Sequence, residues 1–320
     1  MRYRSLGKSG LTVSEIGFGA WGIGGRTAGE TSYGETDDRR SRAALDRAFD
    51  LGITFFDTAN VYGDGHSEVL IGEAFAKKRD RVVIATKAGL TRFGDPPDFS
   101  PAALQRSLAG SLERLKSAYV DLFQLHNPPP DLFRRSPESY AALQAMQREG
   151  KVRAVGISVK TPADALSILE THTVAAVQVN LNMLDVRAIE AGLLTSAAAA
   201  GVGIIARTPL CFGFLSGAIA ADTQFPPGDH RRAWARTQIE RWIAGAETMQ
   251  KAAAAPAGQS RSQAALRFCL SFPAVSSVIP GILSPEEAAQ NAAASGFGPL
   301  PDAARDRIVA LNRQIELFAR

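Results

Sequence analysis

The segment VDLFQLH at residues 120–126, an amphipathic stretch at 137–149 and the segment VRAVGIS at 152–158 together decide the fold. Both heptapeptides are short and rich in apolar residues, which is typical of parallel strands covered on both faces. The stretch between them begins with Ser136-Pro137, the signature of a helix N-cap followed by a first-turn proline. A strand, a helix and a second strand in this order predict a right-handed βαβ unit.

The same alternation runs along most of the chain. Eight strands are predicted, at 15–19, 53–57, 82–87, 120–126, 152–158, 176–180, 203–207 and 276–280. Helices are predicted at 37–51, 66–78, 101–117, 137–149, 162–170, 187–200, 260–271 and 285–294. Three more of these helices begin like the first, at Ser100-Pro101, Thr161-Pro162 and Ser284-Pro285. Eight strand–helix units favour an α/β fold of the closed (β/α)8 TIM-barrel type over an open sheet.

The ends of the chain fall outside this alternation. A turn at 8–10 predicts an N-terminal hairpin that caps the barrel floor, and 302–319 predict an extra C-terminal helix. We therefore expect residues 1–320 to form a single barrel domain. The Gly/Pro-rich segment at 211–228 is too long for a simple βα turn and predicts a lid or binding loop.

The composition is that of a globular protein. Of the 320 residues, 45% are hydrophobic and 21% charged, with 29 Gly and 17 Pro, which excludes a disordered or fibrous chain. The two cysteines, Cys211 and Cys269, cannot build a disulfide framework or a four-ligand zinc site, and they fit a reducing cytoplasm. The net charge of +4 is scattered, so no nucleic-acid partner is expected. Without a signal peptide or a long apolar run, no membrane association is expected either.

Polar residues stand at the ends of the predicted strands. They are Asp57, Lys87, His126, Ser158, Gln178, Asn180 and Arg207. Because barrel enzymes carry their chemistry at the carboxyl ends of the strands, this recurrence predicts one polar active site at that end. No Gly-x-Ser-x-Gly motif is present, and the other histidines have no ligand spacing with His126, so neither a nucleophilic serine nor a metal is expected.

Asp57 and Lys87 carry opposite charges at neighbouring strand ends. Burying either charge alone would be very costly, so we expect them to form an ion pair. Tyr62 follows Asp57 by five residues in a loop, from which its hydroxyl can fold back over the pair. A neighbouring ammonium favours the phenolate over the phenol and makes the tyrosine a better proton donor. Each of these residues by itself also has a purely structural interpretation. Asp57 and Lys87 could form a stabilising ion pair, Tyr62 could pack on the surface, and His126 could be a packed histidine inside the barrel.

Residues 17–22 match the pattern Gly-x-Gly-x-x-Gly after a predicted strand. A dinucleotide-binding fingerprint of the Rossmann type requires a helix that opens at the third glycine. The glycine-rich stretch at 23–29 cannot start such a helix. We therefore predict a loop over the barrel mouth here.

Several segments, in the correct order, resemble the aldo-keto reductase superfamily. They are DTANVYG at 57–63, ATK at 85–87, YVDLFQLH at 119–126, GKVRAVGIS at 150–158, TPL at 208–210 with the glycines after it, and IPG at 279–281 with Asn291. The resemblance implies a (β/α)8 barrel that binds NADP(H) and reduces carbonyl compounds without a metal.

The resemblance also implies a role for each site residue. Tyr62 would donate a proton to the carbonyl oxygen as hydride arrives from the nicotinamide, Lys87 paired with Asp57 would assist it, and His126 would orient the carbonyl and stabilise the developing oxyanion. Ser158 and Gln178 would bind the carboxamide, and the loop at 208–217 would wrap the pyrophosphate. The implied cofactor-binding residues are Ala20, Trp21, Asp57, Ser158, Gln178, Arg207, Thr208, Leu210, Gly213, Leu215, Gly217, Gly281, Leu283, Glu287 and Asn291.

Four positions depart from the family pattern. Val159 stands where asparagine is usual, and Arg207 stands where an aromatic ring usually stacks on the nicotinamide. Leu283 replaces a cation of the 2′-phosphate site, and Glu287 replaces a glutamine, although Ser284 and Glu287 also form a capping-box motif. NADP(H) is therefore the expected cofactor by family default, and NAD(H) is the alternative.

Three functions remain open at this point. The first is NAD(P)H-dependent reduction of a small aldehyde, ketone or sugar-like carbonyl. The second is oxidation of a sugar or polyol by the same residues, and the third is a non-catalytic, redox-sensing cofactor-binding subunit. The walls of the substrate pocket are expected from Trp21, the loop near Phe93, the loop at 127–133 and the segment at 212–230. Neither the individual substrate nor the oligomeric state follows from the sequence.

Overall fold

The protein is described by a computed structural model that covers residues 1–27, 31–315 and 317–318. Eight parallel strands form one sheet in sequence order. They are β3 (Phe18–Gly19), β4 (Phe55–Asp57), β5 (Val83–Ala88), β6 (Val120–His126), β7 (Val152–Ser158), β8 (Ala176–Asn180), β9 (Gly203–Arg207) and β10 (Val275–Ile279). Parallel bridges from Ile16 to Val278 and from Gly19 to Gly281 join the first strand to the last. The predicted (β/α)8 TIM barrel is thereby confirmed.

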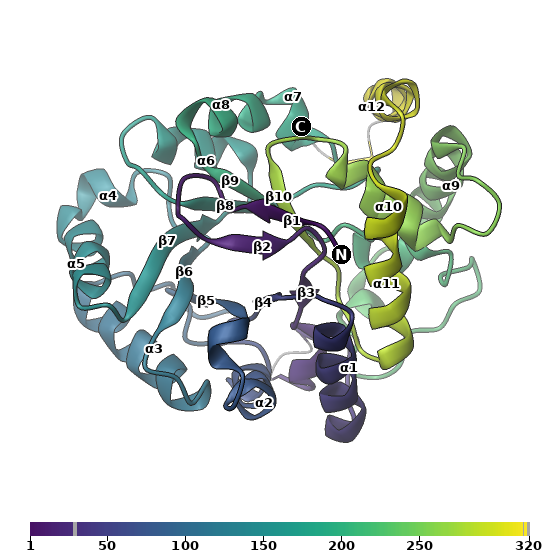
Figure 1. The fold of residues 1–320 in the computed structure, drawn as a ribbon. Helices are drawn as coiled ribbons and strands as arrows, with labels where there is room; N and C mark the ends of the chain where they lie inside the picture. The colour runs from purple at the N-terminus through teal and green to yellow at the C-terminus, as the bar shows by residue number, and fades with distance from the viewer. Residues whose placement is uncertain (28–30, 316, 319–320) are drawn as a thin grey trace.

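Helices surround the barrel (Figure 1). They are α1 (Asp38–Asp50), α2 (His66–Phe75), α3 (Pro101–Arg114), α4 (Leu132–Arg135), α5 (Pro137–Arg148), α6 (Pro162–Leu169), α7 (Arg187–Glu190), α8 (Leu193–Ala200), α9 (Arg236–Ala253), α10 (Arg261–Leu270), α11 (Pro285–Phe297) and α12 (Asp302–Ile315). The predicted C-terminal helix is present as α12, although residues 316, 319 and 320 lie outside the described part. The described residues after the glycines at 17–22 form one short 3-10 helix, Gly22–Gly24, and α1 begins at Asp38.

The sequence prediction missed α9, which lies after the segment predicted as a lid. Its buried residues Ile239, Trp242, Ala246 and Met249 follow helical spacing, so the signal was present among exposed polar residues. The helix predicted at 187–200 is also wrong as a single element. Gly192 has a φ of 74°, which breaks it into α7 and α8.

Three of the four predicted helix caps are confirmed. The side chains of Ser100, Thr161 and Ser284 accept hydrogen bonds from the backbone of the following turn. Ser136 makes no such bond. Its own N–H instead donates to the carbonyl of Leu132, because α4 ends immediately before it.

The barrel floor is closed by an N-terminal hairpin, as predicted, formed by β1 (Tyr3–Ser5) and β2 (Thr12–Ser14). Figure 1 shows this hairpin across the near end of the barrel. Its Leu6 and Val13 are fully buried and belong to one apolar cluster with residues inside the barrel. The strand residues in this cluster are Phe55, Ala85, Leu122, Ala154, Ala176, Ile205 and Ile279. Because the hairpin closes this end of the barrel, a functional site can form only at the opposite end, where the strands finish.

Two long loops meet over that opposite end. The loop after β3 and the loop after β9 pair at Ser32 and Asp229, and the backbone N–H of His230 donates to the carbonyl of Ser32. The His230 ring lies about 5 Å, centroid to centroid, from the rings of Trp21 and Tyr33. These contacts are made just after the lid segment predicted at 211–228, and they tie the loop after β9 to the loop that begins at the barrel mouth.

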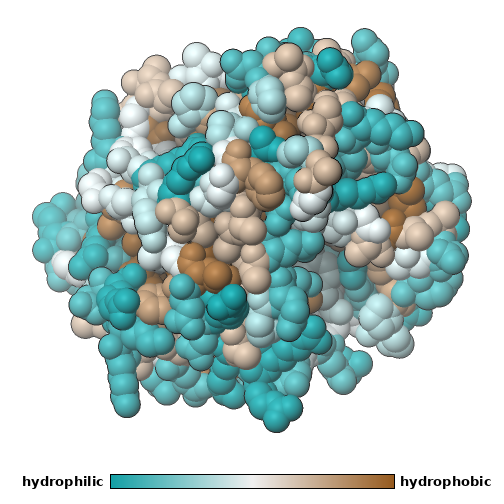
Figure 2. Space-filling view, turned by 45° about the vertical axis from the view of Figure 1, so that its right-hand side comes forward, coloured by the Kyte–Doolittle hydropathy of each residue, from teal (hydrophilic) through white to brown (hydrophobic). Residues whose placement is uncertain are grey.

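The face of the molecule in Figure 2 is largely hydrophilic, with hydrophobic side chains gathered towards its centre. Among the described helices, none combines the length and the apolar character that a membrane span requires.

The burial of His230 leads us to expect that the protein loses stability at acidic pH. Burial lowers the pKa of His230 to about 4, with Asp229 raising it and Arg231 lowering it. Because the unfolded chain takes up this proton near pH 6.5, stability is lost as the pH falls from about 7 to about 4. Discounted for partial exposure, we expect this histidine to account for about 1–2 kcal/mol of that loss.

The test is urea unfolding of His230→Phe at pH 7 and pH 4.5. A phenylalanine ring keeps the aromatic contacts, so this variant should lose less stability at the lower pH than the unmodified protein. His172→Phe is the control, since His172 packs on Phe133 and Tyr140. If the free energy of unfolding depended equally on pH in all three proteins, His230 would not be the source of the stability lost at low pH.

Candidate active site

A cavity of about 900 Å³ opens at the carboxyl ends of the strands. Its walls contain most of the site residues predicted from the sequence. They are Ala20, Trp21, Asp57, Tyr62, His126, Ser158, Gln178, Arg207, Thr208, Leu210, Gly213, Gly217, Gly281, Leu283, Glu287 and Asn291. Lys87 and Leu215 are not among the lining residues, and both are fully buried. One continuous cavity thus brings together residues from position 20 to position 291.

The ion pair expected between Asp57 and Lys87 is present beneath the cavity. Lys87 Nζ lies 2.5 Å from Asp57 Oδ1 and 2.8 Å from the carbonyl oxygen of Thr58. It also donates to Tyr62 Oη at 3.2 Å, so the tyrosine does fold back over the pair. The three polar contacts use all three N–H groups of the ammonium. Tyr62 itself is partly exposed in the cavity wall.

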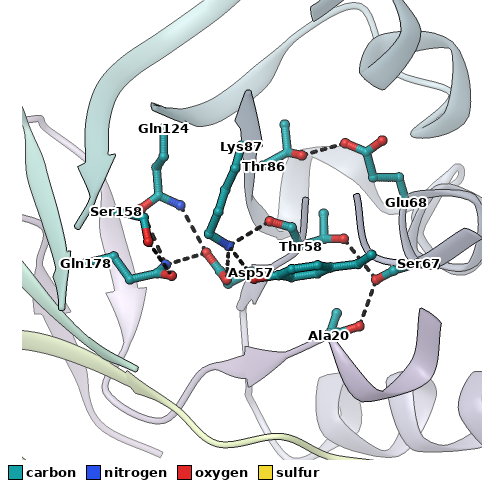
Figure 3. Close-up of polar contacts among 11 residues, drawn as sticks. Ala20, Asp57, Thr58, Ser67, Glu68, Thr86, Lys87, Gln124, Ser158 and Gln178 are labelled. Atoms are coloured by element: carbon teal, nitrogen blue, oxygen red, sulfur yellow. Dashed lines mark hydrogen bonds and ion pairs between the residues drawn. The ribbon is translucent and has the colours of Figure 1, made fainter. Parts of the chain in front are cut away.

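Two glutamine side chains hold the second oxygen of the Asp57 carboxylate. Gln124 Nε2 and Gln178 Nε2 donate to Asp57 Oδ2 at 3.0 and 2.7 Å, and Ser158 Oγ donates to Gln178 Oε1 at 3.3 Å (Figure 3). Gln178 therefore anchors the ion pair, in addition to its expected place beside the carboxamide. Gln124 was not singled out from the sequence, and only its position in the strand that ends at His126 could have indicated it.

A further row of hydrogen bonds fixes the loops around the pair (Figure 3). Thr58 Oγ1 and Ser67 Oγ lie 2.8 Å apart, and Ser67 Oγ donates to the carbonyl of Ala20 at 2.8 Å. Thr86, next to Lys87, donates to the buried carboxylate of Glu68 at 2.5 Å. These bonds join α2 to the ends of β3, β4 and β5, so the helix sets the position of the Tyr62 loop.

The protonation states of Lys87 and His126 follow from their surroundings. Burial by itself lowers the pKa of Lys87, but the Asp57 carboxylate and the Tyr62 oxygen outweigh it and raise the pKa above its usual value. Burial, together with the charges of Lys87 and Arg207, lowers the pKa of His126 well below its usual value. Near neutral pH the site therefore contains an ammonium and a neutral imidazole.

His126 stands between two aromatic rings in the cavity wall. Its ring meets Tyr62 and Phe93 edge-on, with centroids 6.3 and 6.4 Å apart. Its Nδ1 atom is buried without a hydrogen-bond partner in the part of the chain that is described. A neutral imidazole beside the Tyr62 hydroxyl is placed to contact a polar atom of a molecule that enters the cavity.

The backbone turns sharply just after two of the strand ends. Asn127, which follows His126, and Thr208, which follows Arg207, both have a φ of 56°, in the left-handed region that non-glycine residues seldom adopt. Such strain of about 1–3 kcal/mol per residue is typical of functional sites. Both turns leave the preceding side chain facing the cavity.

At the far end of the cavity, Leu283 and Glu287 lie at the start of α11, and Asn291 lies one turn further along the helix. Only half of the predicted capping box is formed. Ser284 Oγ accepts from the N–H of Glu287, whereas Glu287 Oε2 accepts from the N–H of Leu283 at 2.6 Å. This bond holds the Glu287 carboxylate at the cavity wall. The neighbouring Glu286 pairs with Arg40 at 3.6 Å and does not line the cavity.

Some of the residues predicted to wall a substrate pocket line the cavity. Trp21, Phe93 and Phe212 line the cavity, but Asn127 is the part of the 127–133 loop that reaches it, and the His230 side chain stays behind the wall. The sequence prediction missed Tyr33 and Arg231, which also line it, whereas Asp229 lies within the predicted segment at 212–230. The reason is that Ser32 and Asp229 pair only in the folded chain, which brings the two loops together.

The cavity fits a nicotinamide dinucleotide. Trp21 Nε1, His126 Nδ1 and Arg207 Nε are buried there without protein partners among the described residues. The wall runs from Tyr62 to the N-terminus of α11, an end that favours negatively charged groups. Within the described residues, no group of three or more His, Cys, Asp or Glu side chains could hold a metal ion.

The sequence and the fold are similar to those of known proteins. Residues 15–313 match the model of the "Aldo/keto reductase family". L-galactose dehydrogenase of Arabidopsis thaliana is 32% identical and aligns over 91% of this chain and 87% of its own. The NADH-specific methylglyoxal reductase of Escherichia coli is 31% identical over 72% and 73% of the two chains. The solved glycerol dehydrogenase AKR11B4 of Gluconobacter oxydans superposes with a TM-score of 0.80 at 28% identity, covering 99% and 97%.

Proposed function

Because this chain belongs to the aldo/keto reductase family, whose members are NAD(P)-dependent oxidoreductases, we propose that it reduces a small aldehyde, ketone or sugar-like carbonyl with Tyr62 as the general acid. The observation that carries the proposal is the 3.2 Å contact between Lys87 Nζ and Tyr62 Oη at the wall of the cavity. The bound nicotinamide supplies the hydride for this reaction.

Tyr62 delivers the proton to the carbonyl oxygen. As the proton leaves, negative charge develops on Tyr62 Oη, and the Lys87 ammonium stabilises that charge through its hydrogen bond. Asp57 keeps Lys87 charged and directed at the phenol, and Gln124 and Gln178 keep the carboxylate of Asp57 in place. The proton donor and its support are thus assembled before any substrate arrives.

His126 orients the carbonyl in this proposal. The uncharged imidazole hydrogen-bonds the carbonyl oxygen from the side next to Tyr62, and its N–H stabilises the negative charge that grows on this oxygen. Trp21, Phe93 and Phe212 also line the cavity, and their apolar surfaces exclude water from around the bound molecules. A small substrate with one apolar face fits between these rings and the polar strand ends.

We further propose that the enzyme prefers NAD(H), against the NADP(H) default of its family. Leu283 and Glu287 occupy the far end of the cavity, and the cations among its described lining residues, Arg207 and Arg231, come from other segments of the chain. The carboxylate of Glu287, held by the N–H of Leu283, repels a 2′-phosphate and accepts a hydrogen bond from a free ribose hydroxyl. The NADH specificity in the name of the Escherichia coli relative agrees with this choice.

Glu287→Gln tests this preference. The amide oxygen still accepts from Leu283, but the negative charge is gone, so binding should shift towards NADPH by about tenfold, or about 1.4 kcal/mol. The measurement is a fluorescence titration with NADH and NADPH, and Glu286→Gln is the matched control because Glu286 faces Arg40. Tighter binding of NADPH than NADH by the unmodified protein would refute the proposed preference.

Oxidation of a sugar or polyol is a second candidate. It is favoured by the glycerol dehydrogenase structure that matches 99% of this chain, and by the L-galactose dehydrogenase relative. The same residues serve, with Tyr62 as the base that accepts the hydroxyl proton.

The test of the function is absorbance at the reduced-nicotinamide band, with panels of small aldehydes, ketones and aldoses in one direction and polyols in the other. Turnover of carbonyl compounds is expected. Binding of dinucleotide without turnover in either direction would instead support a non-catalytic sensing subunit.

A further inference from the structure

Arg207 is a half-buried cation without a carboxylate partner among the described residues. It ends β9 and lines the cavity, and its Nη2 donates to the carbonyl oxygen of Val159 at 3.0 Å. Its Nε is buried and makes no hydrogen bond within the described residues, and no salt bridge joins it to a described acid. Since an arginine stays protonated in proteins, a full positive charge remains at the cavity wall.

The two carboxylates that act most strongly on the pKa of Arg207, Asp185 and Asp57, are each paired with another cation. Asp57 is paired with Lys87 and held by Gln124 and Gln178. Asp185 binds Arg187 through both oxygens, at 2.8 and 2.7 Å. Neither carboxylate therefore neutralises Arg207.

The charges around the catalytic end of the cavity now add up to about one positive charge. Asp57 and Lys87 cancel each other, and His126 is uncharged near neutral pH. Arg207 remains, and burial lowers its pKa without removing its charge. In a site that excludes water, such a charge acts strongly on any ion bound beside it.

We infer that Arg207 makes this site hold the reduced nicotinamide more tightly than the oxidised one, an inference that rests on the proposed function. The reduced ring is neutral, whereas the oxidised ring carries one positive charge, which Arg207 repels. The dissociation constant of the oxidised dinucleotide should exceed that of the reduced one by at least about tenfold.

This ratio has a consequence for the reaction. A tenfold difference in affinity between the two forms raises the reduction potential of the bound dinucleotide by about 30 mV, since two electrons are exchanged. The oxidised dinucleotide also leaves the site sooner, which frees it for the next reduced molecule. The overall equilibrium of the reaction in solution is unchanged.

The test measures binding, without turnover. Dissociation constants of NADH, NAD⁺, NADPH and NADP⁺ are determined by titration, following tryptophan fluorescence, for the unmodified protein, Arg207→Met and Arg207→Lys. Arg207→Met should tighten binding of the oxidised forms by about tenfold and leave the reduced forms within threefold. Arg207→Lys keeps the charge and should keep the original ratio.

Arg232→Met is the charge control, because Arg232 is exposed in the loop between β9 and α9 and does not line the cavity. In Arg232→Met, the ratio of the dissociation constants of the oxidised and reduced dinucleotides should equal that of the unmodified protein. Equal affinity for both forms in the unmodified protein, or an unchanged ratio in a folded Arg207→Met, would overturn the inference alone. Failure of the unmodified protein to bind either form would overturn both this inference and the proposed function.

Discussion

Replacing Tyr62 with phenylalanine is expected to lower kcat for carbonyl reduction by about 10²–10⁴-fold, the usual contribution of a positioned proton donor. The ring stays, so its edge-on contact with His126 is kept, but the atom that receives the Lys87 hydrogen bond is removed. Binding of the reduced dinucleotide should change by less than about threefold. Steady-state rates and fluorescence titration of the same protein preparation measure the two quantities.

Tyr33→Phe is the matched control for this experiment. Tyr33 lines the same cavity, but its ring packs on Trp21 and His230 in the lid, away from Lys87. Loss of its hydroxyl should leave kcat within about threefold of the original value. If Tyr62→Phe retained a comparable rate, the phenol would not be the proton donor, and the proposed mechanism would be wrong.

Replacing Lys87 with methionine is expected to be the most destabilising of the substitutions discussed. Removing one partner of a buried ion pair leaves an uncompensated charge and costs about 3–5 kcal/mol. Asp57 is 2% exposed and would keep only the two glutamine amides as partners. The free energy of unfolding in urea at pH 7 measures the loss. The reductase rate should fall as well, because Tyr62 loses its hydrogen-bond donor.

The double variant Asp57→Asn/Lys87→Met separates the two effects. With neither charge present, part of the lost stability should return, whereas the rate should stay low because the ammonium is still absent. If Lys87→Met alone were as stable as the unmodified protein, the carboxylate would not depend on Lys87 for its burial, contrary to the 2.5 Å contact.

The barrel could be predicted because its signals are local. Each strand is a short apolar run between turn residues, and the segments at 120–126, 152–158, 176–180 and 203–207 were predicted with the bounds that the structure has. The predictions of secondary structure failed where neighbouring residues masked or overrode a local sequence signal. Ser136 has the residues of a cap but lies at the end of α4, and α9 was hidden among polar residues.

The polar strand ends could also be predicted, since parallel strands in a barrel finish at one end. The sequence by itself therefore predicted that Asp57, Lys87 and His126 lie together at the carboxyl end of the barrel, with Tyr62 in the loop beside them. It could not determine that Gln124 and Gln178 support Asp57, because a glutamine in a strand does not reveal which way its amide will donate.

What the sequence determined alone was thus the order of strands and helices and the set of chemical groups at the strand ends, because both depend on residues close together in the chain. Only the tertiary structure decided the charge balance of the site. Asp185 is committed to Arg187 and Asp57 to Lys87, which leaves Arg207 without a carboxylate. Pairing of charges depends on distances across the barrel, and these exist only once the chain has folded.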